Sequence, residues 1–411
     1  MTEHVLPFEE ALAAVLAQAR GLAPAPAIEM IPLLEARGRV LARRILTDRD
    51  QPPFDRSTRD GYAVRAADVT EGKTLLVLGL IRAGESWRGD ALGEGQAIEI
   101  MTGAPMPAGA DAVLMVEHAV LLGEELQPLE GRSLGKGDNV VPRGAEARNG
   151  DSVLPAGRVI EAAEIAVAAS CGAARLEMVA KPRVAIVATG DELVELGKTP
   201  EAWQIRNSNS YALAALVEDA GGEAARLPVA RDTLADLRAR IAEGREADLL
   251  LLSGGVSMGK FDLVEQVLAE SGAEFFFTGA LIQPGKPIVF GLLPRKDGGG
   301  TYFFGLPGNP VSTQVCFHLF VAPMLRALSG RKDIEPRFAE ARLAEDVKGG
   351  ARVTRFLPAE MTSAWDGVSV RVVGWQGSGD VAANARGNCY VVLPLGVDAF
   401  RAGETVRVLL R

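Results

Sequence analysis

The chain has 411 residues, a length that predicts about two to four domains rather than one hydrophobic core. Apolar residues make up 48% and charged residues 24%, which excludes a wholly disordered or fibrous chain. The net charge of −9 and the aromatic content of 5% argue against binding to nucleic acid or to an anionic membrane. No uninterrupted apolar run reaches the roughly 20 residues of a membrane span.

The N-terminal segment and the cysteines indicate the cellular compartment of the protein. Acidic residues lie before and inside the first apolar stretch, MTEHVLPFEEALAAVL, which favours an amphipathic helix over a signal peptide. Cys171, Cys316 and Cys389 are odd in number and far apart, so they form neither a disulfide framework nor a CxxC motif. We therefore expect a cytoplasmic protein in a reducing compartment.

The first part of the chain predicts a helical and extended domain that is interrupted by an insertion. Helical spacing covers residues 7–20, a Pro/Ala-rich linker or strand follows, and helical character returns in LLEARGRVLARRI up to about Thr47. Residues 51–139 alternate short β-like runs with Gly and Pro turns, and a helical pattern resumes in EAAEIAVAAS. We assign residues 1–50 and 140–180 to an N-terminal domain, and residues 51–139 to an inserted β-rich domain.

The second half predicts an α/β domain followed by a small β domain. Residues 181–330 alternate continuous apolar strands with amphipathic helices, the pattern of a mostly parallel sheet covered on both faces. Ligands of such sheets bind outside the carboxyl ends of the strands. Residues 331–411 are β-like and rich in Gly, which predicts a small barrel or sandwich.

Two loops at predicted strand ends carry carboxylates or glycines. Thr189-Gly190-Asp191-Glu192 could hold a hard cation or accept from ligand hydroxyls, and it could equally be a helix start with acids at the positive end of the dipole. The loop Ser253-Gly254-Gly255-Val256-Ser257 suits an oxyanion, or is an ordinary Gly-rich turn with Asp262 as an N-cap.

Two further loops are stiffened by proline. Gln283-Pro284-Gly285-Lys286-Pro287 offers Lys286 as a point charge for a phosphate, or is a stiff turn with a solvated lysine. Gly305-Leu306-Pro307-Gly308-Asn309-Pro310 sets a Gly-Asn pair between prolines just before a long helix. Together with Asp232, these loops are expected to meet at one sheet edge, which makes the combination far more specific than any single loop.

The inserted domain has two turns that could face a partner surface. One contains Asp60 in DRSTRDGYA, and the other contains Thr102 in IMTGAPMP. Neither turn by itself proves a site.

The ordered segments DGYAV, MTGAPMP with GADAV, ATGDE, SGGVSMGKFD, PGKP and GLPGNPVS resemble the MoeA-type molybdopterin molybdenumtransferase family and the catalytic part of gephyrin. The resemblance covers residues 7 to the C-terminus. It implies a four-part chain that inserts molybdate into adenylylated molybdopterin with release of AMP, assisted by Mg²⁺. It also implies a homodimer whose site combines the inserted domain of one subunit with the α/β domain of the other. Molybdopterin adenylyltransferase and molybdoenzyme-maturation proteins would be its partners.

The resemblance also implies roles for single residues. Glu192, Asp232 and Asp262 match the acidic site positions, with Mg²⁺ near Asp232 and Asp262. The ligand-cradling residues would be Thr189, Gly190, Ser253, Gly254, Gly255, Ser257, Lys286, Pro307, Gly308, Asn309 and Pro310. Asp60, Thr102 and Arg143 match positions in the family's inserted domain. The chain departs from many relatives at Gln283 and Gly279, where they carry lysines, and at Glu146, where some carry Asp.

Two other functions compete with metal insertion. A Mog-like adenylyltransferase shares the SGGVS and GLPGNPVS segments, but the presence of the DGYAV and MTGAP segments argues against that function. A gephyrin-like scaffold that binds receptor tails is the third reading, which the retained site acids disfavour. The sequence does not separate molybdate from tungstate.

Overall fold

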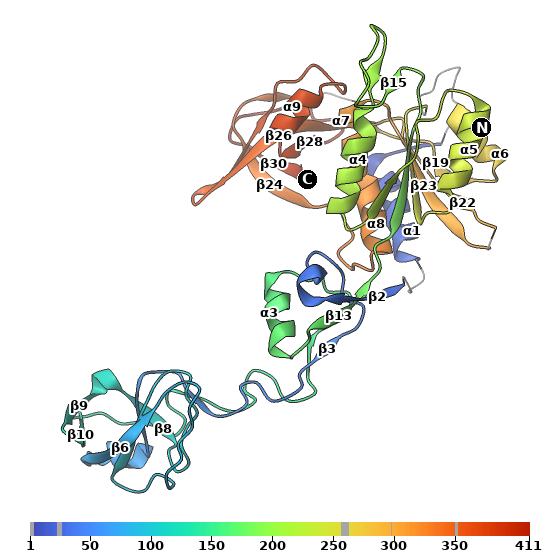
Figure 1. Ribbon diagram of the computed structural model, residues 1–411. Coiled ribbons are helices and arrows are strands. Elements are labelled where there is room, and N and C mark those ends of the chain that lie inside the picture. The colour runs from blue at the N-terminus through green and yellow to red at the C-terminus, as the bar shows by residue number, and fades with distance from the viewer. Residues whose placement is uncertain (1–3, 23–26, 256–262, 297, 350–351) are drawn as a thin grey trace.

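The computed structural model describes residues 4–22, 27–255, 263–296, 298–349 and 352–411. The molecule is elongated (Figure 1): the β-rich module lies at one end, the α/β domain and the C-terminal barrel lie together at the other, and a small domain lies between them. Each part has its own core of buried apolar side chains, as expected for a chain of this length.

The α/β domain is built on a six-stranded sheet in the order β17-β14-β18-β23-β22-β19. Only β22 runs against its neighbours, so the sheet is mostly parallel, as predicted. The strands are β14 (Arg183–Ala188), β17 (Glu223–Arg226), β18 (Leu249–Ser253), β19 (Glu274–Phe277), β22 (Val289–Pro294) and β23 (Gly300–Leu306).

Helices cover both faces of this sheet because its strands are apolar on both sides. Alternate residues of β14 enter different cores: Val184 packs with α1, α4 and α7, whereas Ala185 packs with α5 and α6. The helices are α1 (Phe8–Arg20), α4 (Ser208–Asp219), α5 (Leu234–Gly244), α6 (Leu263–Glu270), α7 (Pro310–Cys316) and α8 (Ala322–Leu328).

A π-helical segment, Phe317–Val321, joins α7 to α8. The joined segment 310–328 has the length and hydropathy of a membrane span, but 72% of it is buried in the protein. It is the core helix of the α/β domain, because Phe317 and Phe320 pack in the same apolar cluster as β14 and β18.

The first helix lies in a different domain from the one expected. α1 contacts α8, and its buried residues Ala11, Val15 and Ala19 belong to the α/β core. Just before it, β1 (Val5–Leu6) pairs with β20 (Gly279–Ala280). The assignment of residues 1–50 as a unit is therefore wrong at its start, because the apolar stripe of α1 completes a core built 300 residues later.

The small domain holds two strand pairs and one helix. β2 (Ile28–Pro32) pairs with β13 (Arg175–Val179), β3 (Ile45–Leu46) pairs with β12 (Ser152–Leu154), and α3 is Ala162–Ser170. The helix predicted up to Thr47 is absent: a 3-10 turn, Leu33–Ala36, gives way to extended chain. Ala36, Leu41 and Ile45 are still buried together, so helix-like spacing here reflects burial of an extended segment.

The β-rich module is an insertion, as predicted. β4 (Arg56–Ser57) pairs with β11 (Val140–Val141), so the chain enters and leaves the module side by side (Figure 1). Its sheet order is β8-β5-β7-β6-β10-β9. The elements are β5 (Gly61–Val64), α2 (Ala66–Thr70), β6 (Leu75–Ile81), β7 (Gln96–Ile100), β8 (Ala112–Met115), β9 (Ala119–Leu122) and β10 (Glu125–Pro128).

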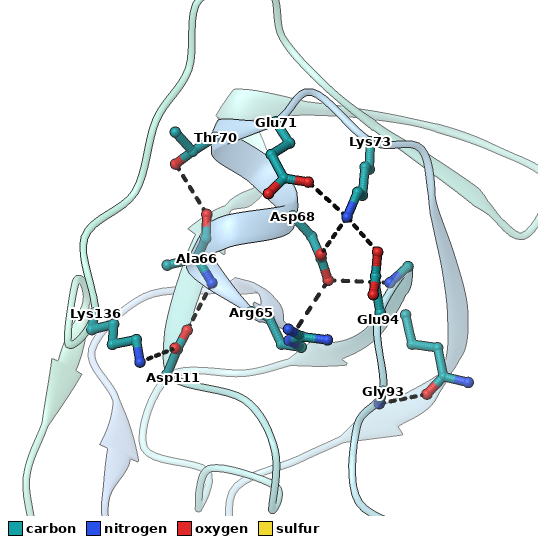
Figure 2. A network of polar contacts seen from close by, with 12 residues as sticks. Arg65, Ala66, Asp68, Thr70, Glu71, Lys73, Gly93, Glu94, Asp111 and Lys136 are labelled. Carbon is teal, nitrogen blue, oxygen red and sulfur yellow. Dashed lines mark hydrogen bonds and ion pairs between the residues drawn. The ribbon is translucent and has the colours of Figure 1, made fainter.

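A polar network holds α2 to this module (Figure 2). Asp68 is buried, and its carboxylate accepts from Lys73 Nζ at 3.3 Å and from the N–H of Gly95 at 3.1 Å. Lys73 also pairs with Glu71 at 2.7 Å and with Glu94. The buried carboxylate is thus compensated, and the network is structural rather than a free ligand site.

The C-terminal domain is a barrel closed by five strands, as expected. The ring runs β26-β27-β24-β30-β28 and closes through the β26–β28 pair. Its elements are β21 (Ile282–Gln283), β24 (Phe338–Leu343), β25 (Val347–Lys348), β26 (Thr354–Ala364), β27 (Gly367–Val372), α9 (Val381–Arg386), β28 (Cys389–Leu393), β29 (Ala399–Phe400) and β30 (Thr405–Leu410). β21 comes from the α/β region and pairs with β26, which joins the barrel to that domain.

Candidate functional site

The carboxyl ends of β14, β18 and β23 meet at one edge of the α/β sheet. The N–H of Thr189 donates to the carbonyl of Ser253 at 3.0 Å, and the N–H of Gly254 donates to that of Leu306 at 3.1 Å. These bonds join the predicted loops TGDE, SGG and PGNP in a row. Parallel strands bring them together, as the sequence pattern led us to expect.

A side chain that the sequence analysis did not select ties these loops together. Asn209, in the first turn of α4, donates from Nδ2 to Ser253 Oγ at 3.0 Å and to the carbonyl of Gly308 at 2.7 Å. α4 begins at the N-cap Asn207, whose side chain accepts from the N–H of Ser210. The segment QIRNSNS could have indicated this role, because it places Asn207 and Asn209 at the start of a helix. One of two such Asn side chains can cap the helix, and the amide of the other is then free to bond elsewhere.

Glycine is required in the SGG loop by both backbone angle and space. Gly254 has φ +94°, and an added Cβ would lie 2.6 Å from the carbonyl oxygen of Thr189. Gly255 has φ +64°, and its Cβ would lie 2.9 Å from Thr189 Cγ2. The backbones of two strand ends therefore approach too closely for any side chain, which leaves the main chain itself facing the site.

The acidic residues of this edge are arranged around the β14 loop. Thr189 Oγ1 donates to Asp232 Oδ1 at 2.8 Å, which positions this exposed carboxylate. The Glu192 carboxylate lies over Gly190, where an added Cβ would come within 2.5 Å of Glu192 Oε2. Among the residues described, no three His, Cys, Asp or Glu side chains cluster as a metal site.

Lys286 lines a neighbouring cavity of about 550 Å³ between the α/β domain and the barrel. Pro307, Asn309 and Ser312 line it from the α/β side, and Arg355 from β26 of the barrel. The N–H of Val311 donates to the carbonyl of Ser378 at 2.9 Å, which joins the two walls. Two cations and a hydroxyl around one cavity are groups that can bind an oxyanion.

Arg355 was not predicted, although it is the second cation of this cavity. Its Nη1 reaches the carbonyl of Lys348 at 3.4 Å, while its buried Nε has no hydrogen-bond partner among the described residues. A buried, unpaired guanidinium N–H is costly, and an anionic ligand is one group that could accept from it. No sequence motif surrounds Arg355, and only the packing of the barrel brings it to Lys286.

The two lysine positions that this chain lacks have different surroundings. Gln283 lines the same cavity as Lys286, so a longer cation would fit there. Gly279 lies against β1, and an added Cβ would be 2.9 Å from Val5 Cγ2. At that position a lysine would require β1 to move.

In the β-rich module, Asp60 and Thr102 form one unit. The N–H and the hydroxyl of Thr102 donate to Asp60 Oδ1 at 2.7 and 2.8 Å. These two bonds, the backbone one first, lower the pKa of Asp60 below its ordinary value. The exposed carboxylate is thereby held ionised and oriented, but the β-rich module that carries it lies at the far end of the molecule from the α/β domain (Figure 1).

Arg143 is engaged within the connection to the module. Its Nε donates to Asp50 Oδ2 at 2.7 Å, and its N–H donates to Asp55 Oδ1 at 2.7 Å. A hydrogen bond from the N–H of Asn149, followed by that from Arg143, lowers the pKa of Asp50. Arg143 therefore holds this connection in shape, and no contact among the described residues joins its guanidinium to Asp60 or Thr102.

The predicted residues thus fall into three groups. The α/β edge brings together Thr189, Gly190, Glu192, Asp232, Ser253, Gly254, Gly255, Pro307, Gly308, Asn309 and Pro310, with Lys286 in the adjoining cavity. Asp60, Thr102 and Arg143 lie apart from it. Ser257 and Asp262 lie outside the described residues.

Covalent catalysis by a cysteine is not supported by the described structure. Burial raises the pKa of the Cys316 thiol far above its ordinary value and that of Cys389 to about 11. An activated thiol needs the opposite shift. His318 is buried with its pKa lowered to about 4, chiefly by desolvation, and so is no partner for a nucleophile.

The chain matches three regions of one family in order. Residues 6–172 match the MoeA N-terminal region (domains I and II), residues 185–327 a probable molybdopterin-binding domain, and residues 340–410 the MoeA C-terminal region (domain IV). A molybdopterin molybdenumtransferase of Staphylococcus aureus is 34% identical over 98% of this chain and 95% of its own. The chain belongs to the MoeA family of molybdopterin molybdenumtransferases.

Further relatives agree along the full length. A molybdopterin molybdenumtransferase of Haemophilus influenzae is 35% identical over 92% of this chain and 93% of its own. Two solved MoeA structures from Pyrococcus horikoshii each cover 99% of the chain, with TM-scores of 0.83 at 29% identity and 0.77 at 32% identity. The family membership accounts for the four-part fold.

Proposed function

We propose that this chain is the molybdenum-inserting enzyme of molybdenum cofactor biosynthesis: it inserts molybdate into adenylylated molybdopterin and releases AMP. The observation that carries the proposal is the cavity of Lys286 and Arg355, which adjoins the row of Gly-rich loops. One part suits a tetrahedral oxyanion and the other a phosphorylated ligand. Because the cavity and the loops are adjacent, they suit a reaction between the bound oxyanion and the phosphorylated ligand.

The residues divide the work by charge. Lys286, Arg355 and Ser312 hold molybdate, because two cations offset its negative charge and the hydroxyl adds a hydrogen bond. The main chain at Gly254 and Gly255 receives the phosphates, where no side chain stands in the way. Positioning the two anions next to each other supplies most of the rate, because without the protein they would repel each other.

Magnesium fits the donors at Asp232. Mg²⁺ keeps several waters and is held by one or two carboxylates together with substrate phosphates, so it needs no closed cage of protein ligands. Asp232 Oδ1 accepts from Thr189, while no described residue donates a hydrogen bond to Oδ2. A bound Mg²⁺ would offset charge on the phosphates there; Asp262, the second predicted ligand, lies outside the described residues.

The proposal includes a homodimer with shared sites. Asp60 and Thr102 are oriented by their mutual hydrogen bonds, but their module lies far from the α/β domain of the same chain, which carries Asp232 (Figure 1). A second copy of the chain, placed with its module against the α/β edge, brings an ionised Asp60 to that edge. The site then takes its oxyanion cavity from one subunit and this carboxylate from the other.

The direct test of the reaction measures molybdenum in the pterin product and AMP released after incubation with adenylylated molybdopterin, molybdate and Mg²⁺. We expect Arg355→Ala to raise the molybdate concentration needed for half-maximal rate. Arg407→Ala, an exposed arginine on β30 of the same barrel, is the matched control. Wild-type protein that releases no AMP and forms no metal-containing product would refute the function.

The shared site is tested with two inactive variants. Asp60→Ala and Asp232→Asn homodimers are unfolded and refolded together in equal amounts. About half the dimers are then mixed, and about a quarter of all sites carry neither lesion. Activity should return to that fraction. Mixed dimers confirmed by mass but without activity would exclude sharing and leave the reaction standing.

The alternatives are tested with the same preparation. An adenylyltransferase would consume ATP on metal-free molybdopterin, whereas the metal-inserting enzyme would not. We further propose a cytoplasmic location and a transient contact with the adenylyltransferase that supplies the substrate.

A further inference from the structure

A flap rises from the candidate site and returns to it. It comprises residues 193–206, with β15 (Leu193–Val194) at its start and β16 (Ile205–Arg206) at its end. It begins next to Glu192 and ends next to Asn207, two residues before the amide that bridges Ser253 and Gly308. Figure 1 shows β15 beyond one end of α4.

Hydrogen bonds within the flap and to α4 hold its shape. At its base, the N–H of Ile205 donates to the carbonyl of Glu192 and that of Asn207 to the carbonyl of Val194, both at 2.9 Å. Its Glu195 accepts from the hydroxyl of Tyr211 on α4 at 3.2 Å. Because these anchors involve main chain or Glu195, they do not depend on the side chains at the flap's surface.

The flap exposes three large apolar side chains. Trp203 is 60% exposed, Ile205 58% and Leu196 46%. The indole Nε1 donates to Glu201 Oε2 at 2.8 Å, which orients the ring and leaves it open to solvent. Arg206 is exposed, and no described residue pairs with its guanidinium.

The order of the groups along the sheet edge indicates which part of a ligand reaches the flap. The cavity of Lys286 and Arg355 lies beyond β23, the glycines follow β18, and Thr189 with Asp232 follows β14 and β17. The flap continues from β14, so in the strand order the Gly-rich loop after β18 lies between the flap and the oxyanion cavity. In adenylylated molybdopterin, the adenosine lies across the phosphates from the part that receives the metal.

We propose that the flap is the adenosine subsite of this reaction, in which Trp203 stacks on the adenine and Arg206 faces the adenosine-side phosphate. The inference rests on the proposed function. An open indole held by one hydrogen bond is a stacking surface for a purine, and a cation without a protein partner suits a phosphate. The subsite would hold the leaving AMP while molybdate occupies the far cavity.

The test uses AMP and ribose 5-phosphate as separate probes in equilibrium titrations. Loss of one stacked base contact raises the Kd by about fivefold or more. We therefore expect Trp203→Ala to weaken AMP binding by at least that factor and to leave ribose 5-phosphate binding unchanged. Trp203→Phe should retain most of the AMP affinity, and Arg206→Ala should weaken both probes. Trp365→Ala, an exposed tryptophan at the tip of the β26–β27 hairpin, is the matched control and should change neither.

A second measurement does not depend on the alanine variant folding. AMP should quench the fluorescence of wild-type protein, and Trp203→Phe should abolish that change. The inference is overturned by unchanged AMP affinity in Trp203→Ala, by equal weakening of both probes, or by quenching that survives Trp203→Phe. Failure of this kind in an enzyme that still forms metal-containing product leaves the proposed function intact. Absence of product from the wild type refutes the function itself.

Discussion

Asn209→Ala is expected to separate loop positioning from general stability. The substitution removes the hydrogen bonds to Ser253 Oγ at 3.0 Å and to the carbonyl of Gly308 at 2.7 Å, while the 3.4 Å approach to Thr313 Oγ1 adds little. Each of the two good bonds contributes about 0.5–1.5 kcal/mol net. The free energy of unfolding should therefore fall by about 1–3 kcal/mol.

The effect on the reaction should be larger than this loss suggests. Without the amide, the SGG and PGNP loops lose their direct side-chain link, and a displacement of about 1 Å in a positioned group costs up to about 100-fold in rate. We expect kcat/KM for AMP release to fall by about 10- to 100-fold under conditions in which the protein stays folded. Urea denaturation and steady-state kinetics on the same preparation give both quantities.

Asn388→Ala provides the matched control. Asn388 also makes two amide hydrogen bonds, both of 2.8 Å and both to the main chain of Met361, but in the barrel and away from the loops. It should lose a similar free energy of unfolding and keep its kcat/KM. If Asn209→Ala loses stability to the same extent and keeps full activity, the amide does not position the loops and the reasoning is refuted.

Two other substitutions test single contacts. Thr102→Val removes one of the two hydrogen bonds that depress the pKa of Asp60, so an NMR titration should show this pKa raised while the backbone bond keeps it below that of a free Asp. A carboxyl whose pKa is depressed in the folded state stabilises the fold above its unfolded pKa of about 3.9, and this stabilisation is lost as the pH falls through the folded pKa. The difference in free energy of unfolding between Thr102→Val and wild type should therefore be present at neutral pH and vanish in acid. A difference that persists in acid would point to lost packing instead. Gly254→Ala should lower the free energy of unfolding by about 1–3 kcal/mol through backbone strain, and the contact of its Cβ with the Thr189 carbonyl should add a further loss. Gly38→Ala, at φ +76° with open space around it, should show the loss from backbone strain alone. Equal losses for the two glycines in urea denaturation would show that the close approach at Gly254 relaxes without cost.

The local pattern of the α/β domain was sufficient to predict its sheet and its ligand-binding edge. Apart from Arg183 at the start of RVAIVA and Ser253 at the end of LLLLS, these strands are apolar at consecutive positions, a pattern that occurs where both faces of a sheet are covered. Once a parallel sheet is inferred, the loops after its strands must gather at one edge, so the proximity of Thr189, Ser253 and Pro307 follows from sequence.

Local pattern failed where burial was completed by a distant segment. The spacing of Ala36, Leu41 and Ile45 predicted a helix, but these residues are buried from a largely extended chain. The stripe of α1 was correctly taken as helical, yet its partner, α8, lies 300 residues away. An apolar periodicity indicates that one face of a segment is buried, but it does not indicate which other segment covers that face.

The tertiary structure alone decided which polar groups meet. Arg355 reaches Lys286 because the barrel packs on the α/β domain, and no sequence motif marks it. Asn209 became a bridge because α4 places its amide between two strand ends. Asp60 and Asp232 both belong to the motifs of the family resemblance, but the module that carries Asp60 and the α/β domain that carries Asp232 lie at opposite ends of the molecule (Figure 1). Side-chain chemistry is local and can be read from the residue, whereas hydrogen bonds and charge pairs act over a few ångströms and depend on how the whole chain is packed.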